Sequence, residues 1–420
     1  MKNLAKTDPK ANKIIKKEIE RQKNGLVLIA SENFASEAVL EALGSPLTNK
    51  YAEGYPKHRY YGGNKFIDEI ESLAIERAKK LFLPKSEWKN WQVNVQPYSG
   101  SPANFAVYAA LLKPGEKLMG MALSHGGHLT HGHKVSFSGK FFSSVLYGVS
   151  PKNYLLDYDE ILKLAIKEKP KIIICGYTAY PRKIDFKKFA QIAKRVGAIL
   201  MADIAHVAGL IAAKVYPSPF PYAEIVTTTT HKTLRGPRGA IIFARNEYAE
   251  AINKAVFPGL QGGPHENNIA GIAVALGEAL KPSFKKYARL VIKNAKVLAK
   301  SLAERGLKIV TGGTDSHLIL VDLTNTGISG KEAEELLEEV NIYVNRNTIP
   351  FDQRPPFNPS GIRLGTPALT TRGMKEKEMK IIADLIAKII FNPKSEKIKK
   401  EVLFEVKKLT KKFPLYKNLK

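Results

Sequence analysis

Short apolar segments of strand length recur between helical patterns from residue 25 to about residue 280 of this 420-residue chain. The clearest are rich in Ile, Val, Ala or Thr and cover residues 171–175, 198–202, 225–229 and 240–244. Strands that alternate with helices predict a mostly parallel sheet covered by helices. Ligands of such sheets bind beyond the carboxyl ends of the strands, so we expect a functional site in the turns that follow these segments.

A second, smaller region follows this pattern. Pro282 and Ser283 precede a long lysine-rich helical pattern, which we interpret as the bridge to that region. Beyond it we expect strands and helices of an α+β domain. The expected strands are 317–323, 342–345 and 361–365, and the expected helices are 331–340 and 376–390. We therefore predict an N-terminal arm or helix at 1–24, a large domain at 25–280 and a small domain at 281–420.

The charge of the chain is strongly basic. Sixty-six Lys and Arg against 39 Asp and Glu give a formal net charge of +27. The lysines are spread along the chain, and the densest block, Lys394–Lys420, is interrupted by glutamates as in an amphipathic helix with a solvated face. We therefore expect no nucleic-acid partner. The alternative, from a class other than enzymes, is a basic RNA-binding protein.

Cysteine content and hydropathy limit the setting of the protein. Cys175 is the single cysteine, which excludes an intrachain disulfide, and its apolar neighbours predict a buried structural thiol. The N-terminus lacks the apolar core of a signal peptide. No run of 18 uncharged apolar residues is present. We expect a cytoplasmic protein without membrane contact.

Two predicted strand ends carry residues suited to carbonyl chemistry. The segment 225–229 leads to Lys232, and the segment 198–202 leads to Asp203. A desolvated lysine is a nucleophile for an aldehyde. A carboxylate can keep a pyridine nitrogen protonated, so the pair suits a pyridoxal phosphate (PLP) site in which the lysine forms the Schiff base. Taken alone, the same spacing also fits a solvated turn lysine and a helix-capping aspartate.

Other segments could bind the anionic groups of a cofactor and a substrate. Ser99, Gly100 and Ser101 precede a helical run, with Ser101 as the expected N-cap, and a helix N-terminus can cradle a phosphate. Arg363 offers a planar fork for the carboxylate of an amino acid. A plain helix start and a surface ion pair are the alternatives.

Two further patterns carry ionisable side chains. His125, His128, His131 and His133 have a spacing like that of a metal cluster, but glycines flank them and no carboxylate or cysteine lies nearby, so we expect no metal site. Glu53 lies between tyrosines, where an acid can have a raised pKa and carry a proton. A solvated loop glutamate is the alternative.

Eight motifs in order resemble one known family, serine hydroxymethyltransferase, from about Gly25 to Arg372. They are Ile29–Asn33, Asn49–Pro56, Arg59–Gly63, Ser99–Ser101, His125–Gly132, Asp203–Leu210, Thr227–Lys232 and Ser360–Ala368. The resemblance implies the α/β fold type I architecture of PLP enzymes, with a large mixed sheet domain and a smaller C-terminal α+β domain. It also implies a homodimer with shared active sites. The implied reaction converts L-serine and a reduced pterin reversibly into glycine and the methylene-pterin.

The resemblance further implies a role for each matching residue. For PLP, it implies Lys232 as the Schiff-base lysine, Asp203 at the pyridine nitrogen, His128 stacked on the ring, His206 and Thr178 near the phenolic oxygen, and His231 with Ser99, Gly100 and Ser101 on the phosphate side. In the partner's site it places Tyr51, Gly262 and Gly263 at the cofactor, the two glycines near its phosphate, and it places Glu53 and Tyr61 at the substrate. For the amino-acid substrate it implies Arg363 and Ser31, and for the pterin Leu123, Gly126, Gly127, His128, Leu129 and Asn347.

Two segments depart from the common family patterns, namely 133–136 and the loop 350–356. Both lie where the resemblance puts the pterin. The carrier is therefore open between tetrahydrofolate and a modified folate such as tetrahydromethanopterin, as in an enzyme of archaeal type. A PLP-dependent threonine-type aldolase would share Lys232, Asp203 and Arg363 and is the alternative enzyme. Aldolase side activity on β-hydroxy amino acids is implied in either case.

Overall fold

The computed structural model describes residues 2–416, which form two compact units. One unit consists of residues 33–289, and the other combines residues 2–32 with residues 290–416. The expected domain boundaries at 24/25 and 280/281 differ from this division. Residues up to Glu32 join the C-terminal unit because β1 (Leu26–Val27) pairs with β13 (Ile342–Tyr343) in parallel, and because Arg372 donates hydrogen bonds to the carbonyls of Lys23 and Gly25 at 2.8 Å.

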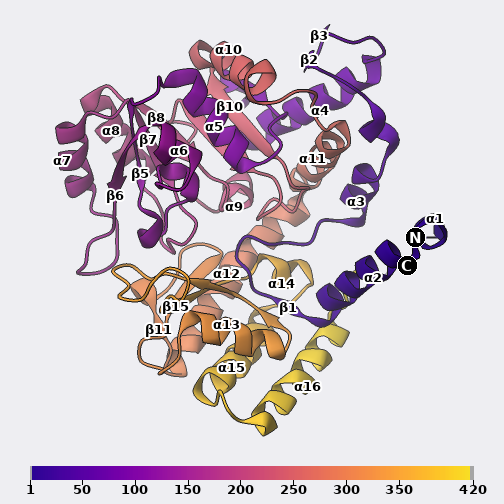
Figure 1. The fold of residues 1–420 in the computed structure, drawn as a ribbon, viewed down its shortest axis with the longest axis vertical. Coiled ribbons are helices and arrows are strands. Elements are labelled where there is room, and N and C mark those ends of the chain that lie inside the picture. Colours follow the sequence, from indigo (N-terminus) through magenta and orange to yellow (C-terminus); the bar gives the residue numbers. More distant parts are fainter. Residues whose placement is uncertain (1, 417–420) are drawn as a thin grey trace. The chain divides into compact units, whose positions relative to one another are not determined.

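The unit of residues 33–289 is built on a seven-stranded sheet with the strand order β4-β10-β9-β8-β7-β5-β6 (Figure 1). Strands β9, β8, β7, β5 and β6 are parallel, whereas β10 is antiparallel to both of its neighbours. The mostly parallel sheet predicted from the sequence is confirmed. The strands are β4 (Trp91–Asn94), β5 (Lys117–Met121), β6 (Ser143–Tyr147), β7 (Ile172–Gly176), β8 (Ile199–Asp203), β9 (Ile225–Thr229) and β10 (Ala240–Arg245). A short hairpin, β2 (Gly54–Tyr55) with β3 (His58–Arg59), lies outside this sheet.

Helices cover both faces of this sheet. Apolar residues of α5 and α10 form one core cluster with alternate residues of the central strands, such as Ile172 and Ile174. On the opposite face, Phe82 of α4 contacts Phe243 at a ring-centroid distance of 5.3 Å, and α8 packs against β7 and β8. The helices of this unit are α3 (Glu37–Leu43), α4 (Lys65–Phe82), α5 (Gly100–Leu111), α6 (Phe137–Phe141), α7 (Tyr158–Glu168), α8 (Phe186–Val196), α9 (Ala208–Ala212), α10 (Asn246–Lys254) and α11 (Glu266–Ala279).

The other unit contains a four-stranded antiparallel sheet in the order β11-β12-β15-β14. Its strands are β11 (Lys308–Ile309), β12 (Leu318–Asp322), β14 (Asn345–Asn347) and β15 (Gly361–Gly365). Its helices are α1 (Lys2–Thr7), α2 (Pro9–Asn24), α13 (Gly330–Glu339), α14 (Pro367–Thr371), α15 (Glu376–Phe391) and α16 (Glu396–Lys412). Helix α12 (Pro282–Glu304) begins in the unit of residues 33–289 and continues into this one. Buried residues of α12, α13, α15 and α16 form a single apolar core with the strands.

The predicted elements agree with the structure closely, with two differences. Strands β9 and β15 begin and end at the predicted residues, whereas the single strand expected at 342–345 is interrupted at Val344 into β13 and β14. Ser101 is not the N-cap of α5, so that prediction is wrong. The helix begins at Gly100, because the amide of Ala103 already donates to the Ser99 carbonyl at 3.1 Å. Pro102 then lies in the first turn, where its missing N–H breaks no helical bond.

The structure also tests the expectations for the single cysteine and for membrane-spanning segments. Cys175 is fully buried in β7, and this burial raises the pKa of its thiol well above the usual range. A buried thiol that stays protonated is a packing residue. Among residues 2–416, no helix is long and apolar enough to cross a membrane.

Candidate active site

The carboxyl ends of β5, β7, β8 and β9 lie along one edge of the large sheet because these strands are parallel. Strand β4 ends at the same edge, since the reversed strand β10 lies between it and β9. The segments that follow these five strands carry the residues predicted for PLP and part of those predicted for the pterin. They are Ser99, Gly100 and Ser101 after β4, Leu123 and Gly126 to Leu129 after β5, Thr178 after β7, Asp203 and His206 at the end of β8, and His231 and Lys232 after β9.

Asp203 is an anionic group fixed from three sides. Its Oδ2 atom accepts hydrogen bonds from Asn104 Nδ2 at 2.9 Å and from His131 Nε2 at 3.0 Å. Its Oδ1 atom accepts from the amide of Ala205 at 3.1 Å. Burial opposes ionisation of Asp203, but the hydrogen bonds from His131 and Asn104 outweigh it and hold the pKa of the carboxyl well below the usual range. A carboxylate of this kind can pair with a protonated pyridine nitrogen.

Lys232 follows β9 in a tightly bonded loop and is buried, with 9% of its surface exposed. Its carbonyl accepts from Asn33 Nδ2 at 2.9 Å. The loop is closed by the hydroxyl of Thr230, which donates to the Pro237 carbonyl at 2.6 Å, and by the amide of Gly236, which donates to the Thr230 carbonyl at 2.7 Å. This fixed backbone holds the lysine at the end of the strand, as an attachment point for a cofactor requires.

The phosphate side of the predicted site has free hydrogen-bonding capacity. His231 Nδ1 is buried and has no hydrogen-bond partner within residues 2–416, and burial together with the charges of Lys232 and Arg238 lowers the pKa of the ring to about 3. The N-cap residue Ser99 makes no side-chain capping bond to α5. A neutral donor beside an uncapped helix start suits a phosphate. Gly100 is required here, since a Cβ on it would lie 2.7 Å from Thr229 Cγ2. These residues fit PLP.

The turn after β5 is held against β7. The Gly126 carbonyl accepts from the amide of Thr178 at 2.7 Å, and the Thr178 hydroxyl donates to the Gly127 carbonyl at 2.6 Å. Gly126 has a φ of +103°, which favours glycine. A Cβ on Gly127 would lie 1.9 Å from the Met121 carbonyl oxygen. Both glycines are therefore needed for the shape of the segment that carries His128 and Leu129.

The residues predicted for the substrate carboxylate occur together in the unit that contains β15. Arg363 is buried, and its Nη2 atom lies 3.4 Å from Ser31 Oγ. Its Nε atom donates to Asn345 Oδ1 at 3.0 Å across the β14–β15 pair. Burial lowers the pKa of the Arg363 guanidinium to about 10. Gly365 permits the approach of the Ser31 segment, because a Cβ on it would lie 2.5 Å from Ala30 Cα. Asn347, predicted for the pterin, lies in the neighbouring strand β14.

The residues predicted for the partner's site form a separate cluster. The rings of Tyr51 and Tyr61 are 5.0 Å apart, and the charge of Glu53 raises the pKa of Tyr51. The glycine loop lies against the same residues, since a Cβ on Gly262 would lie 3.3 Å from Glu53 Oε1 and one on Gly263 would lie 3.7 Å from Tyr51. Segments about 200 residues apart in the sequence are thus brought together.

A buried arginine that sequence reasoning missed holds Glu53 in place. Arg59 Nη1 donates to the carbonyls of Ala52 and Gly54, the two neighbours of Glu53, at 2.9 Å each. Its Nη2 atom pairs with Glu71 at 2.7 Å, and the side chains of both residues are almost fully buried. Arg59 lies in one of the family motifs, but its partner Glu71 lies on α4, so the sequence motif alone did not reveal the pair.

Glu266 is a second buried acid that the sequence did not single out. It is 1% exposed at the start of α11, and neither carboxyl oxygen has a hydrogen-bond partner among the described residues. Burial and the nearby carboxylate of Glu71 raise its pKa to about 8, although the charge of Arg59 opposes this. Glu266 is therefore protonated at neutral pH in the folded chain.

Replacing Glu266 by Gln should flatten the alkaline limb of the stability profile. The unfolded chain releases this proton near the ordinary pKa of 4.5, whereas the folded chain holds it up to about 8. Stability therefore falls as pH rises from 4.5 through 8, by on the order of 1 kcal/mol per pH unit between pH 6 and 8. Thermal unfolding measured at pH 6 and at pH 9 should show that Glu266→Gln loses less stability between these two pH values than the wild type does. The exposed Glu250→Gln is the control, and equal losses in all three proteins would contradict the assignment.

The four-histidine motif has other partners than a metal. Across residues 2–416, no three His, Cys, Asp or Glu side chains gather as a metal site requires. His125 Nδ1 accepts from the amide of Val149 at 3.1 Å, and His131 contacts Asp203 as described above. The structure thus gives these two histidines hydrogen-bonding roles within the protein.

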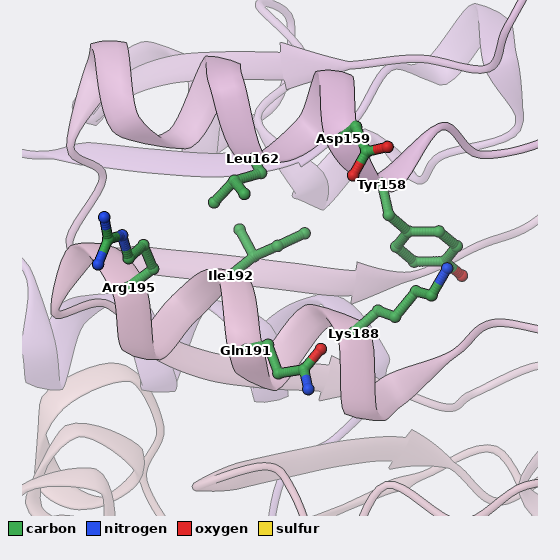
Figure 2. A pocket seen from close by; sticks show the side chains of 7 residues that line it. All are labelled: Tyr158, Asp159, Leu162, Lys188, Gln191, Ile192 and Arg195. Atoms are coloured by element: carbon green, nitrogen blue, oxygen red, sulfur yellow. The ribbon is translucent and has the colours of Figure 1, made fainter.

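A hollow of about 270 Å³ lies between α7 and α8, and none of the predicted site residues line it. Figure 2 shows Leu162 and Ile192 facing each other across it, with Arg195 at one end and Lys188 at the other. The Lys188 ammonium lies 5.0 Å from the centre of the Tyr158 ring. This hollow contains no nucleophile with an acid or base partner, so we do not assign the active site to it.

A lysine beyond one parallel strand, a carboxylate at the end of the next and a phosphate cradle at a helix start define a PLP-dependent enzyme of fold type I. Comparison with known proteins agrees. The family model for serine hydroxymethyltransferase matches residues 4–386. The chain is similar to proteins named serine hydroxymethyltransferase from three organisms. The identity is 58% to the protein of Crocosphaera subtropica, 57% to that of Rippkaea orientalis and 56% to that of a Nostoc species. Each match covers 99% of this chain and 96%, 97% and 96% of the respective relative. The chain belongs to the serine hydroxymethyltransferase family.

These relatives come from cyanobacteria, so they lend no support to an archaeal type of enzyme. Membership of the family makes the chain a PLP-dependent glycine hydroxymethyltransferase, which interconverts serine and glycine.

Proposed function

We propose that this chain transfers the hydroxymethyl carbon of L-serine to tetrahydrofolate, in the cytoplasm, as a homodimer with shared active sites. The observation that carries the catalytic part is the buried Lys232 beyond β9 beside the anionic Asp203 at the end of β8. The identity of 56–58% to cyanobacterial relatives over almost the whole chain supports tetrahydrofolate over an archaeal carrier.

Each residue at the sheet edge has a role in holding the cofactor. Lys232 is its attachment point, and Asp203 holds the proton on the pyridine nitrogen. His231 and the start of α5 bind the phosphate, while His128, Thr178 and His206 contact the ring and its phenolic oxygen. When bound, PLP supplies an electron sink for the bond broken at the substrate Cα. The protein's own task is to orient that bond and to move protons.

Arg363 orients the substrate. Its guanidinium, with Ser31 beside it, binds the serine carboxylate through two parallel hydrogen bonds. Asn345 holds Nε at 3.0 Å and so fixes the plane of the fork. Burial of Arg363 strengthens the attraction for a carboxylate, because the charge has little water around it.

Replacing Arg363 by Lys should weaken serine binding by about 2 kcal/mol, or roughly 30-fold. An ammonium group carries the charge but cannot form the two parallel bonds. Serine affinity, measured from the spectral change of the PLP-loaded enzyme, tests this. Arg346→Lys on β14, whose arginine forms a half-exposed ion pair with Glu334 at 3.2 Å, is the matched control. An unchanged affinity in Arg363→Lys would assign the carboxylate to another residue.

The cluster around Glu53 supports a shared site in a homodimer. The rings of Tyr51, Tyr60 and Tyr61 are between 48% and 75% exposed, and the Tyr60 amide donates to the Glu53 carbonyl at 3.0 Å. Exposed apolar patches mark interaction sites. In the proposal this surface meets a second copy of the chain, so that Glu53 handles protons in the partner's site.

The pterin is proposed to contact Leu123, Gly126, Gly127, His128, Leu129 and Asn347. A serine-cleavage assay with tetrahydrofolate and with tetrahydromethanopterin tests the carrier, and we expect glycine formation to be faster with tetrahydrofolate. A preference for tetrahydromethanopterin would contradict this choice. Cleavage of threonine-like substrates, with no carrier-dependent cleavage of serine, would favour the aldolase. A salt-dependent gel shift at physiological ionic strength would reveal a nucleic-acid partner, which the proposal does not include.

A further inference from the structure

His131 belongs to the four-histidine motif, and the roles proposed for binding the cofactor, the substrate and the pterin do not include it. It is 1% exposed, and its Nε2 atom lies 3.0 Å from Asp203 Oδ2. Its Nδ1 atom accepts a hydrogen bond from the amide of His128 at 3.3 Å. An amide N–H can only donate, so Nδ1 is the unprotonated nitrogen and Nε2 carries the proton that faces Asp203. The backbone thus sets the tautomer that donates to the carboxylate.

Asn104 supplies the second side-chain donor to the same carboxylate oxygen. Its Nδ2 atom lies 2.9 Å from Asp203 Oδ2 and 2.9 Å from Thr130 Oγ1. Its Oδ1 atom accepts from the hydroxyl of Thr227 at 2.7 Å, which fixes the orientation of the amide. Asp203 Oδ2 therefore receives two donors whose directions are each determined by a further hydrogen bond.

The same network reaches His128. Thr130 lies between His128 and His131 in the sequence, and its Oγ1 atom is 2.7 Å from His128 Nδ1. The Thr130 amide donates to that nitrogen at 3.1 Å, so His128 Nδ1 is an acceptor as well. The hydroxyl of Tyr108 donates to the Thr130 carbonyl at 2.9 Å. The ring of His128 and the carboxylate of Asp203 are thus oriented by one connected set of buried groups.

We propose that His131 is a positioning residue for the cofactor, which keeps Asp203 oriented and anionic for the pyridine nitrogen while its backbone contact sets the turn that carries His128. The inference rests on the proposed role of Asp203. A buried carboxylate is costly unless it is paired and hydrogen-bonded, and the protein must bear that cost before PLP arrives. Loss of the His131 donor should therefore weaken PLP binding itself, apart from any effect on turnover.

Two substitutions of His131 separate donation from packing. In His131→Gln, the terminal amide nitrogen can reach the position of Nε2 and still donate to Asp203. In His131→Asn, the shorter side chain reaches only the position of Nδ1, so it cannot donate a hydrogen bond to Asp203. The matched control is His133→Asn, because His133 belongs to the same motif but contacts a different group. Its Nδ1 atom accepts a hydrogen bond from the amide of Val135 at 3.4 Å.

The measurement is the dissociation constant of PLP from each apoprotein, together with the visible spectrum of the bound cofactor. We expect His131→Asn to weaken binding on the order of 10- to 100-fold, the range for a hydrogen bond to a charged group. Its spectrum should shift, whereas His131→Gln and His133→Asn should stay close to the wild type. Thermal unfolding of each apoprotein checks that it is folded.

Several results would overturn the proposal. One is wild-type affinity and spectrum in His131→Asn. Another is equal impairment, or loss of folding, in both His131→Asn and His131→Gln, which would make His131 a packing residue. Asp203→Ala shows which assignment has failed. If Asp203→Ala loses PLP while His131→Asn does not, only the role of His131 is wrong, and if Asp203→Ala also keeps PLP, the role of Asp203 is wrong.

Discussion

Lys232→Ala should give a folded protein that lacks the visible absorption of the lysine-bound cofactor and converts no measurable serine. Lys232 is buried at the end of β9, and the loop around it is held by the backbone bonds of Thr230 and Gly236, which the substitution leaves in place. Alanine keeps the backbone but removes the amine to which the cofactor attaches. The loss in turnover should reach several orders of magnitude.

The measurement is an absorption spectrum of the purified protein after incubation with PLP, with circular dichroism as the test of folding. Lys169→Ala is a suitable control because Lys169 is an exposed residue just beyond α7. Retained cofactor absorption in Lys232→Ala would show that another lysine holds PLP.

Glu53→Gln should impair pterin-dependent serine cleavage roughly 100-fold or more, the range for a positioned acid or base. Glutamine keeps the shape of the side chain, and Arg59 still holds the carbonyls of Ala52 and Gly54, so the loss isolates proton transfer. Aldol cleavage of threonine-like substrates should fall much less, because the substrate hydroxyl and another base can serve there. Equal losses in both reactions would argue against a specific role in one-carbon transfer.

Mixing the two variants tests the shared site. A heterodimer of Glu53→Gln and Lys232→Ala subunits has one site with both lesions and one site with neither. Random exchange should therefore restore about one quarter of the wild-type sites. A mixture of Glu53→Gln with the double variant has no intact site and should stay inactive. If the first mixture also stays inactive although the subunits exchange, Glu53 serves its own chain and the shared-site proposal fails.

The sequence was sufficient for the parts of the fold and the site that depend on local pattern. Strand β9 and the lysine beyond it follow from an apolar segment that leads into a polar turn, and Asp203 follows from the end of β8. Parallel pairing then places both at one edge of the sheet. These features need no knowledge of distant partners, which is why they could be predicted.

The missed features depend on contacts between residues far apart in the chain. Asp203 and Asn104 are 99 positions apart, and Arg59 and Glu71 are joined only when α4 packs beside the hairpin. Neither pairing has a signal in local periodicity. The start of α5 was misplaced because serine is a good N-cap at both Ser99 and Ser101, and only the backbone bond from Ala103 to Ser99 distinguishes them.

The central claim is that Lys232, beyond β9, holds the cofactor of this enzyme. The most direct test is to reduce the PLP-loaded protein with borohydride, which fixes the cofactor to the lysine that holds it, and to locate the modified residue by peptide mass spectrometry. The account predicts a single modified position at Lys232, and addition of excess L-serine before reduction should remove it. Modification of a different lysine, or of many lysines to similar extents, would contradict the account.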